Sequence, residues 1–222
     1  MFRGKMSTNL ANLSYLALAW LLYFAIHSAL ASLTLKRWLA SHWPQFTPIY
    51  RLFYNILAVV LLIPPFWLLH IAESEPLWAW HGTWRLLANG LAIAAILGFW
   101  WSLRYYDSRE FLGLRQIHTT QERQRFSISP FHRFVRHPWY FFGLVIIWTR
   151  DMDPAWLVSC IAITLYFVIG SWLEEQKLVA EFGNLYRRYQ RRVPGLFPLP
   201  GRYLSRAEAA EILAISINSK LG

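Results

Sequence analysis

The sequence predicts an all-α protein that crosses a membrane several times, and three features point that way. Of the 222 residues, 56% are hydrophobic and only 15% are charged, whereas roughly 25% of the residues in ordinary soluble domains are charged. The hydrophobic residues form runs close to the roughly 20 residues that a helix needs to cross a bilayer. Basic residues flank these runs. We therefore expect a polytopic membrane protein with about five transmembrane helices, including a C-terminal helical hairpin, and a cytosolic interfacial helix.

The first three spans are expected over 9–35, 49–72 and 84–105. The first run is of full span length and lacks a clear small-residue cleavage site, so we expect a retained span rather than a signal peptide. Pro64 and Pro65 interrupt the second run. Because neighbouring helices can satisfy the carbonyls that a proline leaves unpaired, we expect a kink there rather than an end.

A helical hairpin is expected after a polar stretch, from a short apolar run over 138–149 and a longer one over 155–173. A helix of the short run's length rises about 18 Å, against roughly 30 Å of hydrocarbon. Its polar start at Arg136 and His137 would then lie partly within the membrane, where an ionisable group indicates a functional site. The alternative is a helix that begins near His132, with Arg136 merely reaching the interface.

The distribution of charge predicts the orientation. Of the 22 Lys and Arg residues, a five-span topology leaves only Arg3, Lys5, Arg85 and Arg150 on the side of the N-terminus. Because basic loops stay in the cytoplasm, we expect the N-terminus outside and the C-terminus in the cytosol. This arrangement accounts for the formal net charge of +10, so we expect contacts with membrane lipids and none with nucleic acid.

The chain is expected to form one membrane domain over 1–222, because no linker, low-complexity tract or repeat divides it. Cys160, its single cysteine, lies inside an apolar run. Neither a disulfide framework nor a cysteine metal cluster is therefore possible, and we expect no metal site. Nothing in the sequence indicates an oligomeric state.

Two polar segments carry the candidate chemistry. The first covers 130–140, with the sequence Pro-Phe-His-Arg-Phe-Val-Arg-His-Pro-Trp-Tyr, and Gly143 follows it. Pro138 suits the first turn of a helix, where free backbone amides can hold an anionic group such as a carboxylate. This segment is a candidate anion-binding site.

The second segment begins with Glu174 and Glu175 and continues to the sequence Phe-Gly-Asn-Leu-Tyr-Arg-Arg-Tyr over 182–189. Adjacent residues on a helix point about 100° apart, so we expect at most one of the two glutamates to face any given pocket. The arginines over 187–192 are expected to lie on an amphipathic helix and to touch anionic lipid.

Together these segments resemble the integral membrane methyltransferases related to isoprenylcysteine carboxyl methyltransferase and the phospholipid methyltransferases. That family has an Arg-His-Pro-x-Tyr motif at the start of a hairpin, here 136–140, followed by a Glu-Glu pair and a Phe-Gly-x-x-Tyr-x-x-Tyr tail. The resemblance covers 111–198. The sequence over 111–116 and the His27-Ser28 pair are similar to the bacterial branch that includes methanethiol S-methyltransferase.

The resemblance implies an S-adenosylmethionine-dependent methyltransferase of a bacterial inner membrane, acting on a small thiol or on a lipid-like acceptor such as an isoprenylcysteine or a phospholipid. It places cofactor binding within 111–198. One glutamate would accept hydrogen bonds from the ribose hydroxyls or the ammonium, and an aromatic ring would face the sulfonium. The implied cofactor contacts are Gln116, His137, Trp139, Tyr140, Gly143, Glu174 and Glu175.

The candidate catalytic residues are His27, Arg136 and His137. A carboxylate acceptor needs no base, but a thiol does, and a histidine with a pKa near neutrality is suited to that task. His27 lies about 27 Å along the first span, at a depth comparable with that expected for His137. The alternative for His27 is a buried histidine bonded to a serine or to a backbone carbonyl.

Two other classes of function stay open. The first is a haem-binding membrane protein related to nitric oxide reductase accessory proteins or carotenoid isomerases, in which His27 would pair with His118 or His137. The second is a non-enzymatic scaffold whose 13 Trp, 11 Tyr and 15 Phe form aromatic belts at the membrane interfaces. The ionisable residues of the hairpin favour the enzyme.

Overall fold

The structure is a computed structural model that describes residues 6–7, 10–73, 75–107, 109, 112, 114 and 126–218. The chain divides into two compact units, which we describe one at a time. The first unit comprises 1–81, 106–122 and 150–163, and the second comprises 82–105, 123–149 and 164–222. The prediction of a single membrane domain stays a prediction.

The first unit is built on apolar helices that follow one another along the chain. Two-residue strands β1 and β2 pair in parallel, with Met6 opposite Ala72. Apart from the start of α8, the elements whose bounds the described residues of this unit give are β1 (Met6–Ser7), α1 (Leu10–Ala31), α2 (Leu33–His42), η1 (Pro44–Phe46), α3 (Thr47–Leu61), α4 (Ile63–Ile71) and β2 (Ala72–Glu73).

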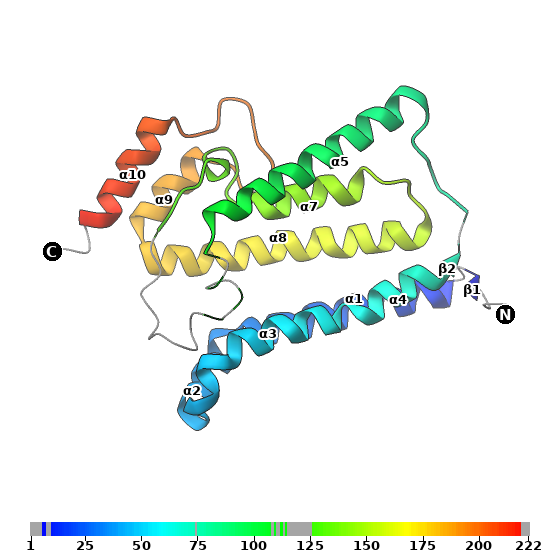
Figure 1. The fold of residues 1–222 in the computed structure, drawn as a ribbon, viewed down its shortest axis with the longest axis horizontal. Helices are drawn as coiled ribbons and strands as arrows, with labels where there is room; N and C mark the ends of the chain where they lie inside the picture. Colours follow the sequence, from blue (N-terminus) through cyan, green and yellow to red (C-terminus); the bar gives the residue numbers. More distant parts are fainter. Residues whose placement is uncertain are drawn as a thin grey trace. The chain divides into compact units, whose positions relative to one another are not determined.

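The first helix ends earlier than the run over 9–35 predicts. Helix α1 stops at Ala31, and the side chain of Ser32 accepts a hydrogen bond from the backbone nitrogen of Leu35 at 3.2 Å. Serine is a strong N-cap, so a second helix, α2, begins at Leu33 and leaves α1 at an angle (Figure 1). The prediction missed the capping signal of this serine inside an apolar run.

The two prolines of the second predicted span start a helix instead of ending one. Helix α3 ends at Leu61, and Pro64 and Pro65 lie in the first turn of α4, where a missing N–H has no cost. The interruption is confined to Leu62, since the backbone nitrogen of Phe66 again donates to the Leu62 carbonyl at 3.2 Å. Pro44–Ile71 is long and apolar enough to form one membrane span, so the prediction that the prolines do not end this span is confirmed.

The core of the first unit joins α1 to the start of α8 (Pro154–Phe182). Leu16, Trp20 and Ala155 are buried there together. The indole nitrogen of Trp20 donates to the hydroxyl of Ser159 at 2.9 Å, so the polar edge of this large buried ring is satisfied.

The second unit contains the expected hairpin. Helix α7 lies between α5 and the later part of α8 (Figure 1). The two arms of the hairpin, α7 and the later part of α8, run antiparallel, since Trp148 contacts Thr164 and His137 contacts Glu175. Besides α8, the helices of this unit are α5 (Gly82–Ser102), η2 (Leu103–Tyr105), η4 (Phe131–Arg133), α7 (Pro138–Trp148), α9 (Asn184–Arg192) and α10 (Arg206–Asn218).

The start of α7 and the length of α8 determine where the polar residues of the hairpin lie. Helix α7 begins at Pro138, separate from the single turn η4, so the alternative of a helix starting near His132 is wrong. Helix α8 runs on past the predicted end at residue 173 and stops only before Gly183, whose φ of 58° suits glycine. Glu174 and Glu175 therefore lie on a helix, as expected, beyond the end of its apolar run.

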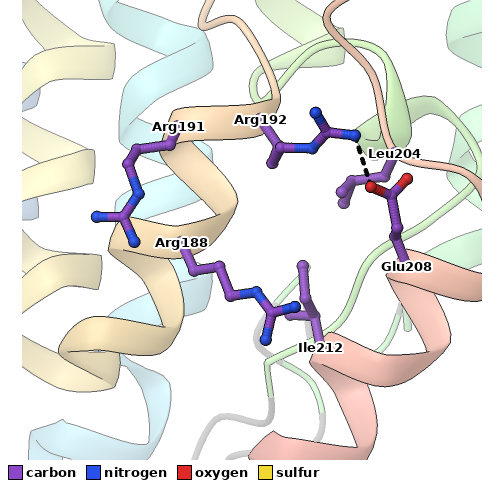
Figure 2. A pocket seen from close by; sticks show the side chains of 6 residues that line it. All are labelled: Arg188, Arg191, Arg192, Leu204, Glu208 and Ile212. Atoms are coloured by element: carbon purple, nitrogen blue, oxygen red, sulfur yellow. Dashed lines mark hydrogen bonds and ion pairs between the residues drawn. The ribbon is translucent and has the colours of Figure 1, made fainter.

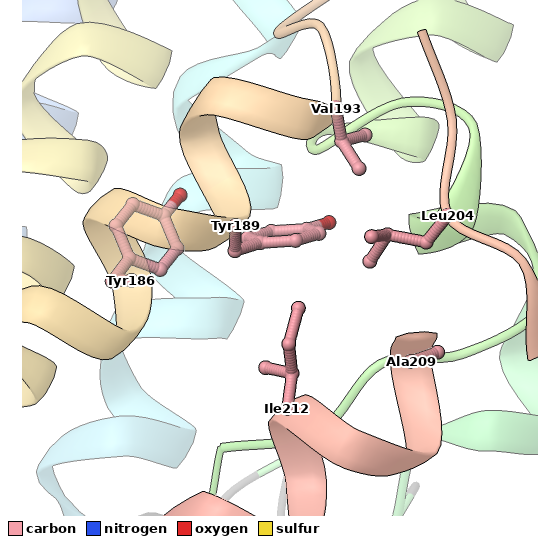
Figure 3. Close-up of a cluster of buried hydrophobic side chains, with 6 residues drawn as sticks. All are labelled: Tyr186, Tyr189, Val193, Leu204, Ala209 and Ile212. Carbon is pink, nitrogen blue, oxygen red and sulfur yellow. The ribbon is translucent and has the colours of Figure 1, made fainter. Parts of the chain in front are cut away.

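The interfacial helix α9 packs its tyrosines inward and its arginines outward. Tyr186 and Tyr189 are buried with four residues contributed by the following segment and α10 (Figure 3), namely Val193, Leu204, Ala209 and Ile212. Helix α10 starts with a reciprocal capping box between Ser205 and Glu208, with bonds of 2.8 and 3.1 Å.

Among the described residues, four helical segments are long and apolar enough to cross a membrane: Leu10–Ala31, Pro44–Ile71, Gly82–Tyr105 and Pro154–Phe182. The apolar helix α7 has only 11 residues. The predicted all-α, polytopic membrane class is confirmed, with a short fourth apolar helix as expected.

Candidate active site

The backbone before α7 is held by hydrogen bonds from the segment that follows α9. The backbone nitrogens of Arg136 and His137 donate to the carbonyls of Pro194 and Gly195 at 2.9 and 3.1 Å. Upstream, Arg133 and Leu204 bond reciprocally, because each donates a nitrogen to the other's carbonyl at 2.9 Å. The non-helical stretch before α7 is therefore held at both of its ends, at Arg133 and at Arg136 and His137.

Arg136 joins this stretch to both α8 and α9. Its Nε lies 2.7 Å from Oε1 of Glu175 and its Nη2 lies 3.0 Å from Oε2, a bidentate ion pair. Its Nη1 donates to the carbonyls of Gln190, at 2.9 Å, and Val193. The amide of Gln190 also donates to Oε2 of Glu175 at 2.9 Å. The two charged side chains are only 14% and 15% exposed, so this pair is desolvated and strongly oriented.

His137 lies between the two glutamates. Its Nε2 is 3.0 Å from Oε1 of Glu175, and its Nδ1 is 3.4 Å from Oε2 of Glu174. Ionised carboxylates can only accept hydrogen bonds, so the contacts favour a ring that carries a proton on both nitrogens. Burial lowers the pKa of His137, but the hydrogen bonds and charges of Glu174 and Glu175 outweigh it and raise this pKa above 6.5.

This arrangement contradicts the expectation that only one of the two glutamates can face a given site. The side chains of Glu174 and Glu175 leave the helix in different directions, but an imidazole has nitrogens on two edges and His137 contacts both carboxylates. The environments of the glutamates differ, since Glu175 is 15% exposed and Glu174 is 51% exposed.

Tyr140 and Gly143 continue the site along α7. The ring of Tyr140 stacks on His137 at a centroid distance of 5.5 Å and on Phe167 at 4.5 Å. A Cβ at Gly143 would lie 3.2 Å from the Phe167 ring, so this glycine allows α7 and α8 to approach closely. Among the described residues, the Tyr140 hydroxyl has no hydrogen-bond partner.

Trp139 faces a different helix. Its indole nitrogen donates to the hydroxyl of Ser102 on α5 at 2.7 Å, and its ring packs against Phe99 at 5.4 Å. The structure therefore brings together Arg136, His137, Tyr140, Glu174 and Glu175, whereas the indole of Trp139 is engaged in packing against α5.

The other predicted site residues are not among those whose contacts, described above, define this cluster of the second unit. His27 belongs to the first unit, where its Nε2 lies 2.7 Å from the Tyr54 hydroxyl and its ring lies 5.5 Å from that of Tyr23. Gln116 and His118 lie outside the described residues.

Sequence reasoning missed Gln190, Gly195 and Tyr54. Gln190 directly follows the Phe-Gly-x-x-Tyr-x-x-Tyr tail, but nothing in its position indicates a bond to Glu175. Gly195 is a tight neighbour of the ion pair, since a Cβ there would lie 3.4 Å from Nη2 of Arg136. Only the contacts of the folded chain identify these residues.

Fold and site together define an integral membrane protein with a buried Arg-Glu-His cluster at the start of its last hairpin. Methanethiol S-methyltransferase 2 of Bradyrhizobium diazoefficiens is 32% identical over 200 residues, which cover 86% of this chain and 75% of the relative. The enzyme named methanethiol S-methyltransferase from Mycobacterium tuberculosis is 31% identical over 194 residues, covering 81% and 76% of the two chains. The chain belongs to the methanethiol S-methyltransferase family and is a membrane methyltransferase.

A third relative, the methanethiol S-methyltransferase of Crocosphaera subtropica, is 29% identical over 188 residues, or 79% of this chain and 71% of that protein. No profile of a known protein family matches the sequence. No solved structure matches it either.

Proposed function

We propose that this chain uses S-adenosylmethionine to methylate a small thiol, with methanethiol as the substrate to test first. The names of the relatives support the thiol, because each protein described above is called a methanethiol S-methyltransferase. The cofactor proposal rests mainly on the different surroundings of the two glutamates. Glu175 is enclosed by Arg136 and His137, while the Glu174 side chain is 51% exposed.

The residues of this cluster fit the polar groups of S-adenosylmethionine. Its ammonium and ribose hydroxyls are donors, and an exposed carboxylate such as that of Glu174 is a matching acceptor. The Tyr140 hydroxyl, beside His137 on α7, offers a second polar contact. In this proposal Glu174 and Tyr140 touch the cofactor, while Arg136 and Glu175 position His137 and the start of α7.

When bound, S-adenosylmethionine supplies an electrophilic methyl group, so that a carbon–sulfur bond forms to the acceptor thiolate as the sulfonium carbon–sulfur bond breaks. The chain must align the acceptor, exclude water and accept the thiol proton. His137 is a poor candidate for that proton, since its contacts with Glu174 and Glu175 favour its protonated form. His27, bonded to Tyr54, is the base that we propose.

The proposed setting is a bacterial inner membrane, with the N-terminus outside and the C-terminus in the cytosol. The distribution of basic residues supports this orientation. The cofactor would enter from the cytosol and an apolar acceptor from the lipid. Because both ring nitrogens of His137 face carboxylates, the second unit offers no argument for the haem alternative.

The acceptor is tested by offering the purified protein labelled S-adenosylmethionine with methanethiol, a farnesylcysteine analogue or phosphatidylethanolamine. We expect label in dimethyl sulfide from the first reaction alone. Label in either lipid-like product, with none in dimethyl sulfide, would contradict the proposed acceptor.

The cofactor site is tested by isothermal titration with S-adenosylmethionine. Glu174→Gln is expected to weaken binding by about tenfold, because a charge-assisted hydrogen bond becomes a neutral one. The matched control is Glu181→Gln, which removes the same charge from an exposed position on the same helix. Equal affinities of wild type and Glu174→Gln, both with normal unfolding temperatures, would remove Glu174 from the site.

A further inference from the structure

A hollow with a basic lining lies between α9 and α10 (Figure 2), and its lining includes none of the five residues of the active-site cluster. Its volume is about 160 Å³. Arg188 and Arg192 extend from α9 toward α10, and Leu204 and Ile212 provide apolar lining (Figure 2). The full lining consists of Arg188, Arg191, Arg192, Leu204, Glu208 and Ile212.

We propose that this hollow binds the phosphate of an anionic phospholipid headgroup. Three arginines line it against a single carboxylate, that of Glu208. The guanidinium groups of Arg188 and Arg192 face α10, while that of Arg191 points away from it (Figure 2). Guanidinium groups bind phosphate oxygens with two parallel hydrogen bonds. The charge of the lining therefore matches a phosphate.

The acids beside the hollow do not hold its arginines firmly. Arg188 pairs with Glu211 at 2.9 Å and Arg192 pairs with Glu208 at 2.5 Å, yet the four side chains are between 37% and 56% exposed. Ion pairs this exposed contribute only about 0–1 kcal/mol in most proteins. A phosphate can thus replace a carboxylate on either arginine at little cost.

The position of α9 selects a lipid as the source of the phosphate. The membrane-spanning helix α8 ends at Phe182, and α9 begins at Asn184 with only Gly183 between them. The apolar run of α8 ends at residue 173 and charged residues follow it, so α9 lies beyond the hydrocarbon, where arginines are attracted to anionic headgroups. Leu204 and Ile212 line the floor of the hollow, but both belong to the buried cluster with Tyr189, so the surface open to a ligand comes mainly from the charged side chains.

The proposal is tested by native mass spectrometry of the full chain in detergent, titrated with phosphatidylglycerol or with phosphatidylcholine of the same acyl chains. Inorganic phosphate is the third ligand. We expect selective binding of phosphatidylglycerol, reduced about tenfold in the double variant Arg188→Gln, Arg192→Gln. Arg187→Gln is the matched control, since it removes an exposed arginine of the same helix that does not line the hollow.

A second variant is expected to change the affinity for phosphatidylglycerol in the opposite direction. Glu208→Gln removes the competing carboxylate, while glutamine still caps the start of α10, so it should bind phosphatidylglycerol more tightly. The proposal is overturned if the double variant binds as wild type does, or if Arg187→Gln loses as much affinity. It also fails if Glu208→Gln weakens binding, or if phosphatidylcholine or free phosphate binds as well as phosphatidylglycerol.

Discussion

Arg136 and Glu175 form a bidentate ion pair in which Nε lies 2.7 Å from Oε1 and Nη2 lies 3.0 Å from Oε2. The pair connects the residue two positions before α7 to the middle of the later part of α8. The same guanidinium donates to the carbonyls of Gln190 and Val193. One side chain therefore holds three segments of the second unit around His137.

We predict that Arg136→Lys lowers the free energy of unfolding by about 3 kcal/mol, because a lysine cannot bind both oxygens and leaves a mostly buried carboxylate short of partners. Chemical unfolding in detergent micelles measures the loss. Arg188→Lys is the control: its pair with Glu211 is exposed, so the expected loss is below about 1 kcal/mol. Similar losses in the two variants would show that the Arg136 pair has no special structural role.

The sequence predicted most residues of this cluster but not the hydrogen bonds that connect them to the rest of the chain. The Arg-His-Pro-x-Tyr motif and the Glu-Glu pair were recognisable in the chain, and periodicity placed both on the last hairpin. The bond from Gln190 to Glu175, and the backbone bonds to Pro194 and Gly195, depend on how the chain returns after α9. No local pattern encodes such long-range contacts.

The helices were predictable to the extent that local signals dominate. Apolar runs identified the spans, and Pro138 marked the start of α7 correctly. The end of α1 was missed because Ser32, a capping residue, lies inside an apolar run. The bound at residue 173 marks only the end of the apolar run of α8, because the charged residues from Glu174 onward continue the same helix to Phe182.

The two histidines near the cluster predict opposite pH dependences of stability. The pKa of His137 is raised above 6.5, so its contribution to stability is complete below pH 6.5 and is lost as the pH rises through the raised value. Burial, and then the charge of His137, lower the pKa of His132 to about 4, with Glu174 opposing them. The folded chain therefore keeps His132 neutral, and stability falls as the pH drops from 6.5 toward 4.

Thermal unfolding of the wild type, His137→Gln and His132→Gln across this pH range measures both effects. We expect His137→Gln to flatten the decline on the alkaline side and His132→Gln to reduce the decline on the acid side. Unchanged slopes on both sides would contradict the two pKa directions.

Close packing of α5 on α7 provides a third prediction. A Cβ at Gly98 would lie 2.8 Å from the ring of Phe142, which is buried. Gly98→Ala should therefore cost about 1–3 kcal/mol of stability, because the ring must move within a packed interface. Gly90→Ala on the same helix meets nothing within 4 Å, so it should cost nothing. Thermal unfolding of the two variants gives the comparison, and equal stabilities would contradict this packing.

The proposed base is tested by the pH dependence of methyl transfer. His27 Nε2 lies 2.7 Å from the Tyr54 hydroxyl. In the tautomer whose Nε2–H donates to this oxygen, the lone pair lies on Nδ1, and we propose that Nδ1 accepts the thiol proton. His27→Asn should then slow turnover most at neutral pH, and the deficit should shrink as the pH rises, because more of the thiol is ionised before it binds. Initial rates with methanethiol over a pH series measure the ratio between variant and wild type.

The exposed His70 supplies the control for this comparison, since His70→Asn makes the same exchange at the end of α4 and should leave the rates unchanged. A His27→Asn deficit that stays constant at every pH would assign His27 a structural role. Tyr54→Phe then tests whether His27 itself accepts the proton or whether the Tyr54 hydroxyl is needed for the transfer. If His27 is the base, loss of the hydroxyl should lower kcat at neutral pH but keep the pH-dependent recovery, because the imidazole is still present to take the proton.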